Sequence, residues 1–134
     1  MKNSLELLLA WYKKNDFDIP WRTNINPYNI WISEIMLQQT QVKTVKKYYS
    51  KWMKKFPTID RLAKSNIDDI LKIWEGLGYY QRAHNIYSTS KIIYKKHNKK
   101  IPDRYSELLK LKGIGDYTAS AILSIALCLP TSSI

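Results

Sequence analysis

Apolar residues recur at spacings of three and four along most of this chain, which is the period of an amphipathic α-helix. The clearest such stripe consists of Val42, Val45, Tyr49, Trp52 and Phe56. Strict alternation of apolar and polar residues, which marks a half-buried strand, is almost absent. The pattern therefore predicts an all-α fold.

The same period predicts the positions of the other helices. Pro57, Pro102 and Pro130 interrupt it, and capping residues precede several segments. We expect Asn66 or Ser65 to cap one helix and Asp103 to cap another. Besides residues 42–56, helices are expected at 4–14, 28–37, 59–64, 67–74, 83–96, 103–111 and 119–127.

The helix at 28–37 is unusual because apolar residues cover much of its surface. Trp31, Ile32, Ile35 and Met36 surround a single carboxyl group, that of Glu34. A carboxylate among apolar side chains is costly to ionise, so we expect a raised Glu34 pKa and a proton donor near neutral pH. The uncharged hydrogen-bonding residues 38–41 follow directly. An ordinary amphipathic helix with a capped end is the alternative interpretation of the same residues.

Length and charge narrow the class of protein. The chain has 134 residues and a net charge of +11, from 22 Lys and Arg against 11 Asp and Glu. This charge predicts attraction to a polyanion, with nucleic acid favoured over an anionic membrane, although coding bias toward Lys, Asn and Ile could produce the same composition. The lysines between 43 and 55 alone indicate only a solvated face.

A membrane span, a secretory signal, a disulfide framework and a metal site are not expected. No apolar run approaches 18 residues, so no membrane span is predicted. Glu6 interrupts the apolar start and no small-residue cleavage site follows, so no secretory signal is expected and an intracellular, cytoplasmic location is the default. We also expect a protein of bacterial type. The single Cys128 provides no disulfide framework, and neither His84 nor His97 has the spacing of a metal ligand.

Two glycine pairs mark turns between helices. Gly76 and Gly78 precede Tyr79, Tyr80 and Arg82, and Gly113 and Gly115 follow Leu111-Lys112. Leu-x-Gly-x-Gly between two helices is a helix-hairpin-helix signal, whose second helix offers free backbone N–H groups to a phosphate oxygen. A glycine at an ordinary helix C-cap gives a similar sequence pattern.

The Pro-flanked loop 19–27 contains Trp21 and Arg22. Together these side chains could hold a flat base between an aromatic plane and a guanidinium group. A packed Trp beside a solvated Arg is the alternative.

Together these motifs resemble the adenine DNA glycosylase family (MutY), within the helix-hairpin-helix DNA glycosylase superfamily. The resemblance rests on four motifs in this order: Pro20-Trp-Arg22, Trp31-Ile-Ser-Glu-Ile-Met-Leu-Gln-Gln-Thr-Gln41, Gly76-Leu-Gly-Tyr-Tyr-x-Arg82 and Leu111-x-Gly-x-Gly-x-Tyr-Thr-Ala119. It implies a six-helix domain, here residues 17–134, with the hairpin at 103–128. Residues 1–16 would form a helix that packs on a second half of the domain. The implied partner is double-stranded DNA with a flipped adenine, bound by a monomer.

The resemblance also implies roles for particular residues. Glu34 matches the catalytic acid that protonates adenine opposite 8-oxoguanine or guanine. Gln39 and Tyr79 match residues that wedge into the duplex while the adenine is flipped out. The remaining assignments to substrate or DNA binding are Trp21, Arg22, Gln38, Tyr80, Arg82, Lys112, Gly113, Gly115 and Thr118.

Tyr117 separates two kinds of chemistry. The related endonuclease III group has a nucleophilic Lys at this position, which forms a Schiff base and then cuts the strand. A phenol cannot form an imine, so Tyr117 indicates hydrolysis without lyase activity.

The chain departs from the family pattern in two respects. The Asp expected to stabilise the sugar cation would fall directly after Ile134, and the four Cys ligands of the family's [4Fe–4S] cluster are missing. We therefore interpret the chain as a fragment or a natural truncation without a cofactor of its own, with weak or no activity. An endonuclease III-like lyase, a non-catalytic DNA-binding helical module and a protein-interaction domain remain the alternatives.

Overall fold

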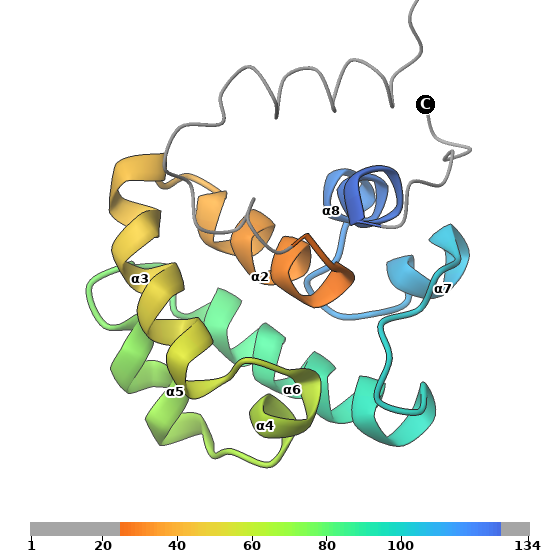
Figure 1. The fold of residues 1–134 in the computed structure, drawn as a ribbon, viewed down its shortest axis with the longest axis horizontal. Helices are drawn as coiled ribbons and strands as arrows, with labels where there is room; N and C mark the ends of the chain where they lie inside the picture. The colour runs from red at the N-terminus through yellow and green to blue at the C-terminus, as the bar shows by residue number, and fades with distance from the viewer. Residues whose placement is uncertain (1–24, 127–134) are drawn as a thin grey trace, which may run out of the picture.

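The computed structural model describes residues 25–126, and the fold is given for these residues alone. They form seven α-helices and one π-helical turn, with no strand among them (Figure 1). The elements are α2 Pro27–Leu37, α3 Val42–Lys55, α4 Ile59–Ala63, α5 Ile67–Trp74, α6 Gln81–Lys96, α7 Tyr105–Leu109, α8 Asp116–Ala121 and η2 Ile122–Ala126. The all-α prediction is confirmed. The bounds of α2 to α5 agree with the predicted helices to within one residue.

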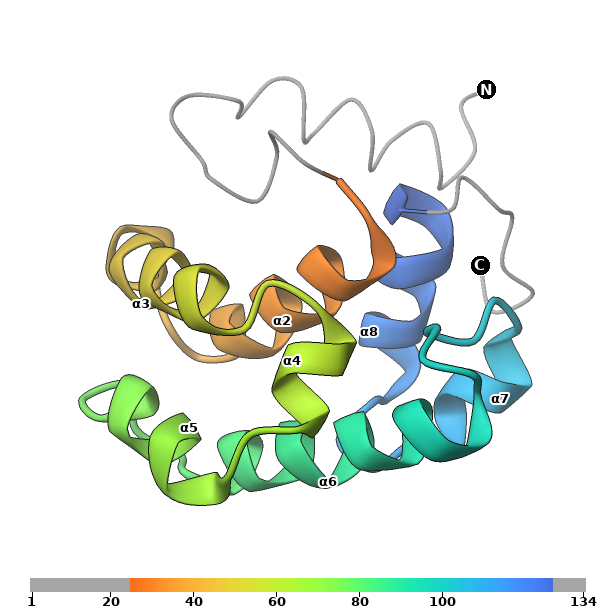
Figure 2. The same ribbon diagram turned by 60° about the horizontal axis from the view of Figure 1, so that its bottom comes forward.

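Helix α2 lies in the middle of the fold. It has α3 on one side and α8 with η2 on the other (Figure 1 and Figure 2). Every residue from 28 to 36 is buried, including Glu34. A helix that is apolar on all sides can be stable only when neighbours cover all of them, which explains why this segment occupies the centre. The predicted buried helix is confirmed.

Aromatic side chains fill the space between α2, α3 and α5. The indole of Trp52 packs edge-on against Phe56 and Trp74, with ring centroids 5.2 and 5.9 Å away. Its Nε1 donates a hydrogen bond to the Tyr28 hydroxyl at 3.0 Å, and that hydroxyl donates to the Phe56 carbonyl. Because these buried polar tips are paired, the aromatic core carries no unsatisfied group at this point.

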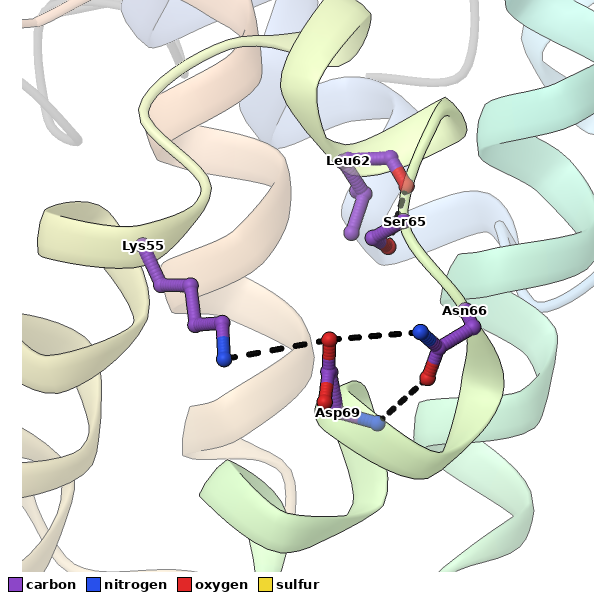
Figure 3. Close-up of polar contacts among 5 residues, drawn as sticks. All are labelled: Lys55, Leu62, Ser65, Asn66 and Asp69. Carbon is purple, nitrogen blue, oxygen red and sulfur yellow. Dashed lines mark hydrogen bonds and ion pairs between the residues drawn. The ribbon is translucent and has the colours of Figure 1, made fainter.

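The start of α5 shows how a local signal fixes a helix end (Figure 3). The Asn66 side chain accepts a hydrogen bond from the Asp69 N–H at 2.9 Å and donates one to the Asp69 carboxylate at 3.3 Å. Lys55 on α3 lies 3.8 Å from the same carboxylate. Ser65, the other candidate cap, donates instead to the Leu62 carbonyl at 2.6 Å. Asn66 is therefore the N-cap of α5.

Replacing Asn66 with Ala is expected to destabilise the protein by about 1 kcal/mol, because the Asp69 N–H loses its acceptor. Urea denaturation followed by circular dichroism measures the loss. Ser50→Ala, at an exposed position in the middle of α3, is the control and should change the free energy of unfolding by only about 0.5 kcal/mol or less. Equal losses in the two variants would contradict the capping role.

Two sequence predictions are wrong in detail. Asp103 does not cap α7: the cap is Arg104, whose side chain makes no capping bond, and the helix begins at Tyr105. Asp103 therefore lies one position before the N-cap, where its side chain is out of register with the first-turn N–H groups. The helix predicted at 119–127 begins earlier, at Asp116, and changes to π-helical hydrogen bonding from Ile122. The helix predicted at 4–14 lies outside the described residues.

No helix among residues 25–126 is both long and apolar enough to cross a membrane.

Candidate functional site

Glu34 and Tyr117 form the centre of the candidate site. Glu34 lies in α2 with only 5% of its surface exposed, whereas Tyr117, the second residue of α8, is 68% exposed. The charge of Glu34 raises the Tyr117 pKa, and partial burial raises it further. This electrostatic effect indicates that the two groups are close, although they are 83 positions apart in the sequence. Tyr117 therefore stays protonated at neutral pH, next to a buried carboxyl group.

Two exposed residues beside this centre have an uncommon backbone conformation. Gln39 has φ of 59° and Tyr79 has φ of 50°, which is the left-handed region that non-glycine residues seldom adopt. Gln39 follows the C-terminal end of α2, and Tyr79 precedes α6. Such strain, of about 1 kcal/mol or more per residue, persists only where the surrounding contacts enforce it.

The Arg82 side chain makes the contacts that hold the backbone around Gln39 and Tyr79 in place. Its Nη1 donates hydrogen bonds to the carbonyls of Ile35 at 2.8 Å, Met36 at 3.3 Å and Gln38 at 2.6 Å. Its Nη2 donates to the Gly78 carbonyl at 3.3 Å. The guanidinium group thus joins the last turn of α2 to the α5–α6 loop. The sequence assigned Arg82 to DNA binding; the geometry makes it a positioning residue for Gln39 and Tyr79.

Aromatic rings enclose the same guanidinium group. Its Cζ lies 5.3 Å from the Trp74 ring centroid and 5.4 Å from that of Tyr79. The indole Nε1 of Trp74 donates to the Gly78 carbonyl at 2.9 Å. Desolvation by these neighbours lowers the Arg82 pKa. An arginine stays charged nonetheless, so stacking and hydrogen bonding both hold it in place.

The α5–α6 loop turns sharply because glycine occupies its second position, after Glu75. Gly76 has φ of 98°, and a Cβ there would collide with the Tyr48 hydroxyl of α3. The Gly76 N–H donates to the Tyr80 hydroxyl at 3.4 Å. Tyr79 and Tyr80 are consequently presented on the surface, with 63% and 45% exposed. Tyr48 was not singled out in the sequence, where it lies beside the apolar stripe of α3.

The turn between α7 and α8 matches the predicted hairpin. Leu111 and Ile114 are buried and anchor the turn, while Lys112 is exposed. The Thr89 hydroxyl of α6 donates to the Lys112 carbonyl at 2.7 Å. Gly115 is the N-cap of α8, and the first bond of the helix runs from the Ala119 N–H to the Gly115 carbonyl. The backbone N–H groups of 116–118 precede that bond and point out of the helix end.

The structure changes the interpretation of Thr118 and adds one residue, Asn85, to the candidate site. Thr118 is only 2% exposed, so any contact of this residue with DNA would come from its backbone N–H rather than its side chain. Asn85 was missed. It packs against Gly113 and lines a cavity of about 70 Å³ together with Trp31, Gln38, Arg82 and Lys112. Its position three residues after Arg82, on the same face of α6, is the signal that could have identified it.

Gly113→Ser and Gly115→Ser form a matched pair with opposite expected outcomes. Gly113 has φ of 83°, and its added Cβ would lie 3.0 Å from the Asn85 Cβ, so we expect a loss of about 1–3 kcal/mol. An added Cβ at Gly115 meets nothing within 4 Å, and Ser is a good N-cap, so this variant should be neutral or slightly stabilised. Thermal denaturation of both variants tests the prediction; equal destabilisation would contradict it.

Metal ligands do not gather in the part of the chain that the structure describes. No group of three or more His, Cys, Asp or Glu residues could hold an ion there. These residues also contain no cysteine, so they do not fit an iron–sulfur cluster. Trp21, Arg22 and Cys128 lie outside the described residues.

Comparison with known proteins gives a consistent assignment. The model of the HhH-GPD superfamily of base excision DNA repair proteins matches residues 32–125. The chain is 55% identical over 120 residues to adenine DNA glycosylase of Buchnera aphidicola subsp. Baizongia pistaciae, and 40% identical over 129 residues to the Homo sapiens enzyme of the same name. The match covers 89% of this chain but only 34% and 23% of those relatives. The chain thus spans about a third of the length of the first relative and less than a quarter of the second.

Solved structures show the same fold. A thermostable thymine-DNA glycosylase superposes with a TM-score of 0.80 at 28% identity, covering 93% of this chain and 58% of the other. An endonuclease III in a non-covalent DNA complex superposes with a TM-score of 0.76 at 22% identity, covering 94% of this chain and 58% of the other.

Proposed function

The chain belongs to the HhH-GPD superfamily of base excision DNA repair proteins, and on this basis we propose that it acts as an adenine DNA glycosylase. The proposed substrate is double-stranded DNA in which adenine is mispaired with 8-oxoguanine or guanine, bound by one copy of the chain. The proposed reaction is hydrolysis of the N-glycosidic bond. The names of the two adenine DNA glycosylases described above support this choice of base.

The observation that carries the proposal is the pairing of buried Glu34 with Tyr117. Departure of a base is easier when a general acid protonates it, and Glu34 is a carboxyl group shielded from water at the centre of α2. The neighbouring side chain is a phenol rather than an amine. A phenol near a carboxyl group can donate a hydrogen bond but cannot form a Schiff base. This arrangement favours hydrolysis over strand cleavage.

The neighbouring elements would bring the adenine to Glu34. A base must leave the stack before its glycosidic bond can be reached, at a cost of a few kcal/mol. Gln39 and Tyr79 are exposed and already held in place by Arg82, so little further ordering is needed for them to enter the duplex. The first-turn N–H groups of α8 would hold a backbone phosphate.

A single-turnover assay tests the proposal directly. Residues 1–134, in excess over the duplex, should release adenine from an adenine:8-oxoguanine pair in preference to an adenine:thymine pair. The carboxylate that the family pattern places after residue 134 is not among these residues, so we expect a rate about 10²–10³ lower than with that group present. An excision rate as high as with that carboxylate present would contradict the expected loss of rate. Release from both pairs at one rate would contradict the proposed specificity.

The endonuclease III-like alternative predicts a different product. A lyase should be trapped on damaged DNA by borohydride as a covalent complex, because its amine forms an imine. We expect no trapping with this chain. Tyr117→Lys, which introduces an amine at this position, is the matched positive control and should be trapped. A cross-link formed by the unmodified chain on oxidised pyrimidines would replace the adenine glycosylase proposal with the lyase.

A further inference from the structure

Helix α3 has an unusually strong positive charge. Its 14 residues include six lysines and no acidic residue. Val45, Tyr49 and Trp52 are buried on the side that faces the core. On the opposite side Lys43, Lys47 and Lys51, called here the lysine stripe, recur at every fourth position and are exposed. At a rise of 1.5 Å per residue their attachment points are about 6 Å apart.

Within residues 25–126 the lysine stripe forms no ion pair with an acidic residue, whereas several other lysines do. Lys64 and Lys99 pair with Asp60, and Lys110 pairs with Glu107. On α3 only Lys55, at the far end, has an ion pair among the described residues, with Asp69. Like charges at a spacing of four repel by about 0.2–0.5 kcal/mol per pair. A polyanion lying along this face would remove that repulsion.

The position of the lysine stripe indicates which polyanion it binds. Helix α3 begins at Val42, three residues after Gln39, so Lys43 lies close to the exposed residue proposed to enter the duplex. Figure 2 shows α3, the C-terminal end of α2 and the α5–α6 loop on the same side of the molecule. Helix α3 thus lies next to the segments that carry Gln39 and Tyr79.

We propose that Lys43, Lys47 and Lys51 bind the phosphate backbone of double-stranded DNA, outside the segment held by the hairpin and by Gln39 and Tyr79. This inference rests on the proposed function, because it takes DNA as the polyanion. The stripe is about 12 Å long, which matches about three to four nucleotides of one strand at 3.4 Å each. Such contacts carry no sequence information; they add affinity and depend strongly on salt.

The test measures DNA affinity against salt concentration for the 134-residue chain and two triple variants. The stripe variant is Lys43→Gln, Lys47→Gln, Lys51→Gln. The control is Lys95→Gln, Lys96→Gln, Lys100→Gln, which removes the same charge. Lys95 and Lys96 lie at the C-terminal end of α6, about 20 Å along the helix from Arg82, and Lys100 follows in the next loop. Both sets are exposed, and circular dichroism checks that each variant is folded. The duplex contains an adenine:8-oxoguanine pair.

The stripe variant should reduce the slope of log K against log[salt] by about 2–3 and weaken binding at ~0.1 M salt at least about tenfold, with a much smaller change in the control. A third variant with Arg at all three stripe positions keeps the charge and should restore the slope. Equal slopes in stripe and control variants would overturn the inference and leave the proposed function intact. An unmodified chain without salt-dependent DNA affinity would overturn both. A stripe variant that lost only its affinity for phosphatidylserine vesicles would make a membrane the partner and overturn the inference.

Discussion

Replacing Glu34 with Gln is expected to reduce single-turnover adenine excision by about 10²–10⁴ while leaving DNA binding unchanged. The amide has nearly the same size as the carboxyl group, so it should fit the same buried position in α2, which is 5% exposed. It cannot give a proton to the departing base. The lost rate therefore measures acid catalysis rather than packing.

Two further readouts separate this prediction from a folding defect. Thermal denaturation should show a folded variant, and a 2-aminopurine placed opposite 8-oxoguanine should still fluoresce on binding, since flipping needs Gln39 and Tyr79 rather than the acid. Excision by Glu34→Gln at the parent rate would rule out Glu34 as the proton donor. Loss of DNA binding in this variant would instead give Glu34 a structural role.

The pH dependence of excision tests the raised Glu34 pKa expected from the apolar neighbours. Only the protonated carboxyl group can donate, so the rate should be highest at low pH and fall as pH rises through the Glu34 pKa. With a raised pKa this fall comes above the range of an ordinary Glu, about 4.3. A rate already falling at that ordinary value would contradict the expectation.

Replacing Arg82 with Met is expected to destabilise the protein by about 2–4 kcal/mol, lowering Tm by on the order of 10 °C. The side chain donates to four carbonyls, three of them at the C-terminal end of α2. The Ile35 carbonyl also accepts the Gln38 N–H and the Gln38 carbonyl also accepts the Thr40 hydroxyl, but both are helix-end acceptors with spare capacity. Removing the guanidinium group takes away the charged donor that these carbonyls and the Met36 carbonyl share. Met keeps the apolar contacts of the stem, so the loss reports the hydrogen bonds of the guanidinium group together with its stacking on Trp74 and Tyr79.

Arg82→Lys distinguishes charge from geometry. A lysine keeps the positive charge but has a single ammonium group, which cannot reach carbonyls on both α2 and the α5–α6 loop. We expect it to recover only part of the stability and little of the 2-aminopurine signal, because Gln39 and Tyr79 are no longer held together. Arg61→Met, at an exposed position on α4, is the matched control and should change Tm little. Full recovery by Lys would mean that charge alone suffices.

The sequence by itself determined the helices and the buried carboxyl group. The period of three to four places α2 to α5, because helix-forming residues with an apolar face can be recognised from neighbours along the chain. The dense apolar surface around Glu34 required a central helix, and the structure has it. The same local reasoning limited the cap of α5 to Asn66 or Ser65, and the hydrogen bonds of the structure select Asn66. The Asp103 cap was wrong because α7 begins at Tyr105, one residue later than a cap at 103 requires.

Only the tertiary structure decided what the other site residues do. Arg82 reaches carbonyls 44 to 47 positions away, and nothing in its own segment indicates them. The left-handed backbone of Gln39 and Tyr79 also depends on contacts with distant segments, and so does the approach of Gly113 to Asn85. The electrostatic effect of Glu34 on Tyr117 arises because α8 packs against α2. Local patterns specify helices, but these interactions join residues that become neighbours only when the helices pack.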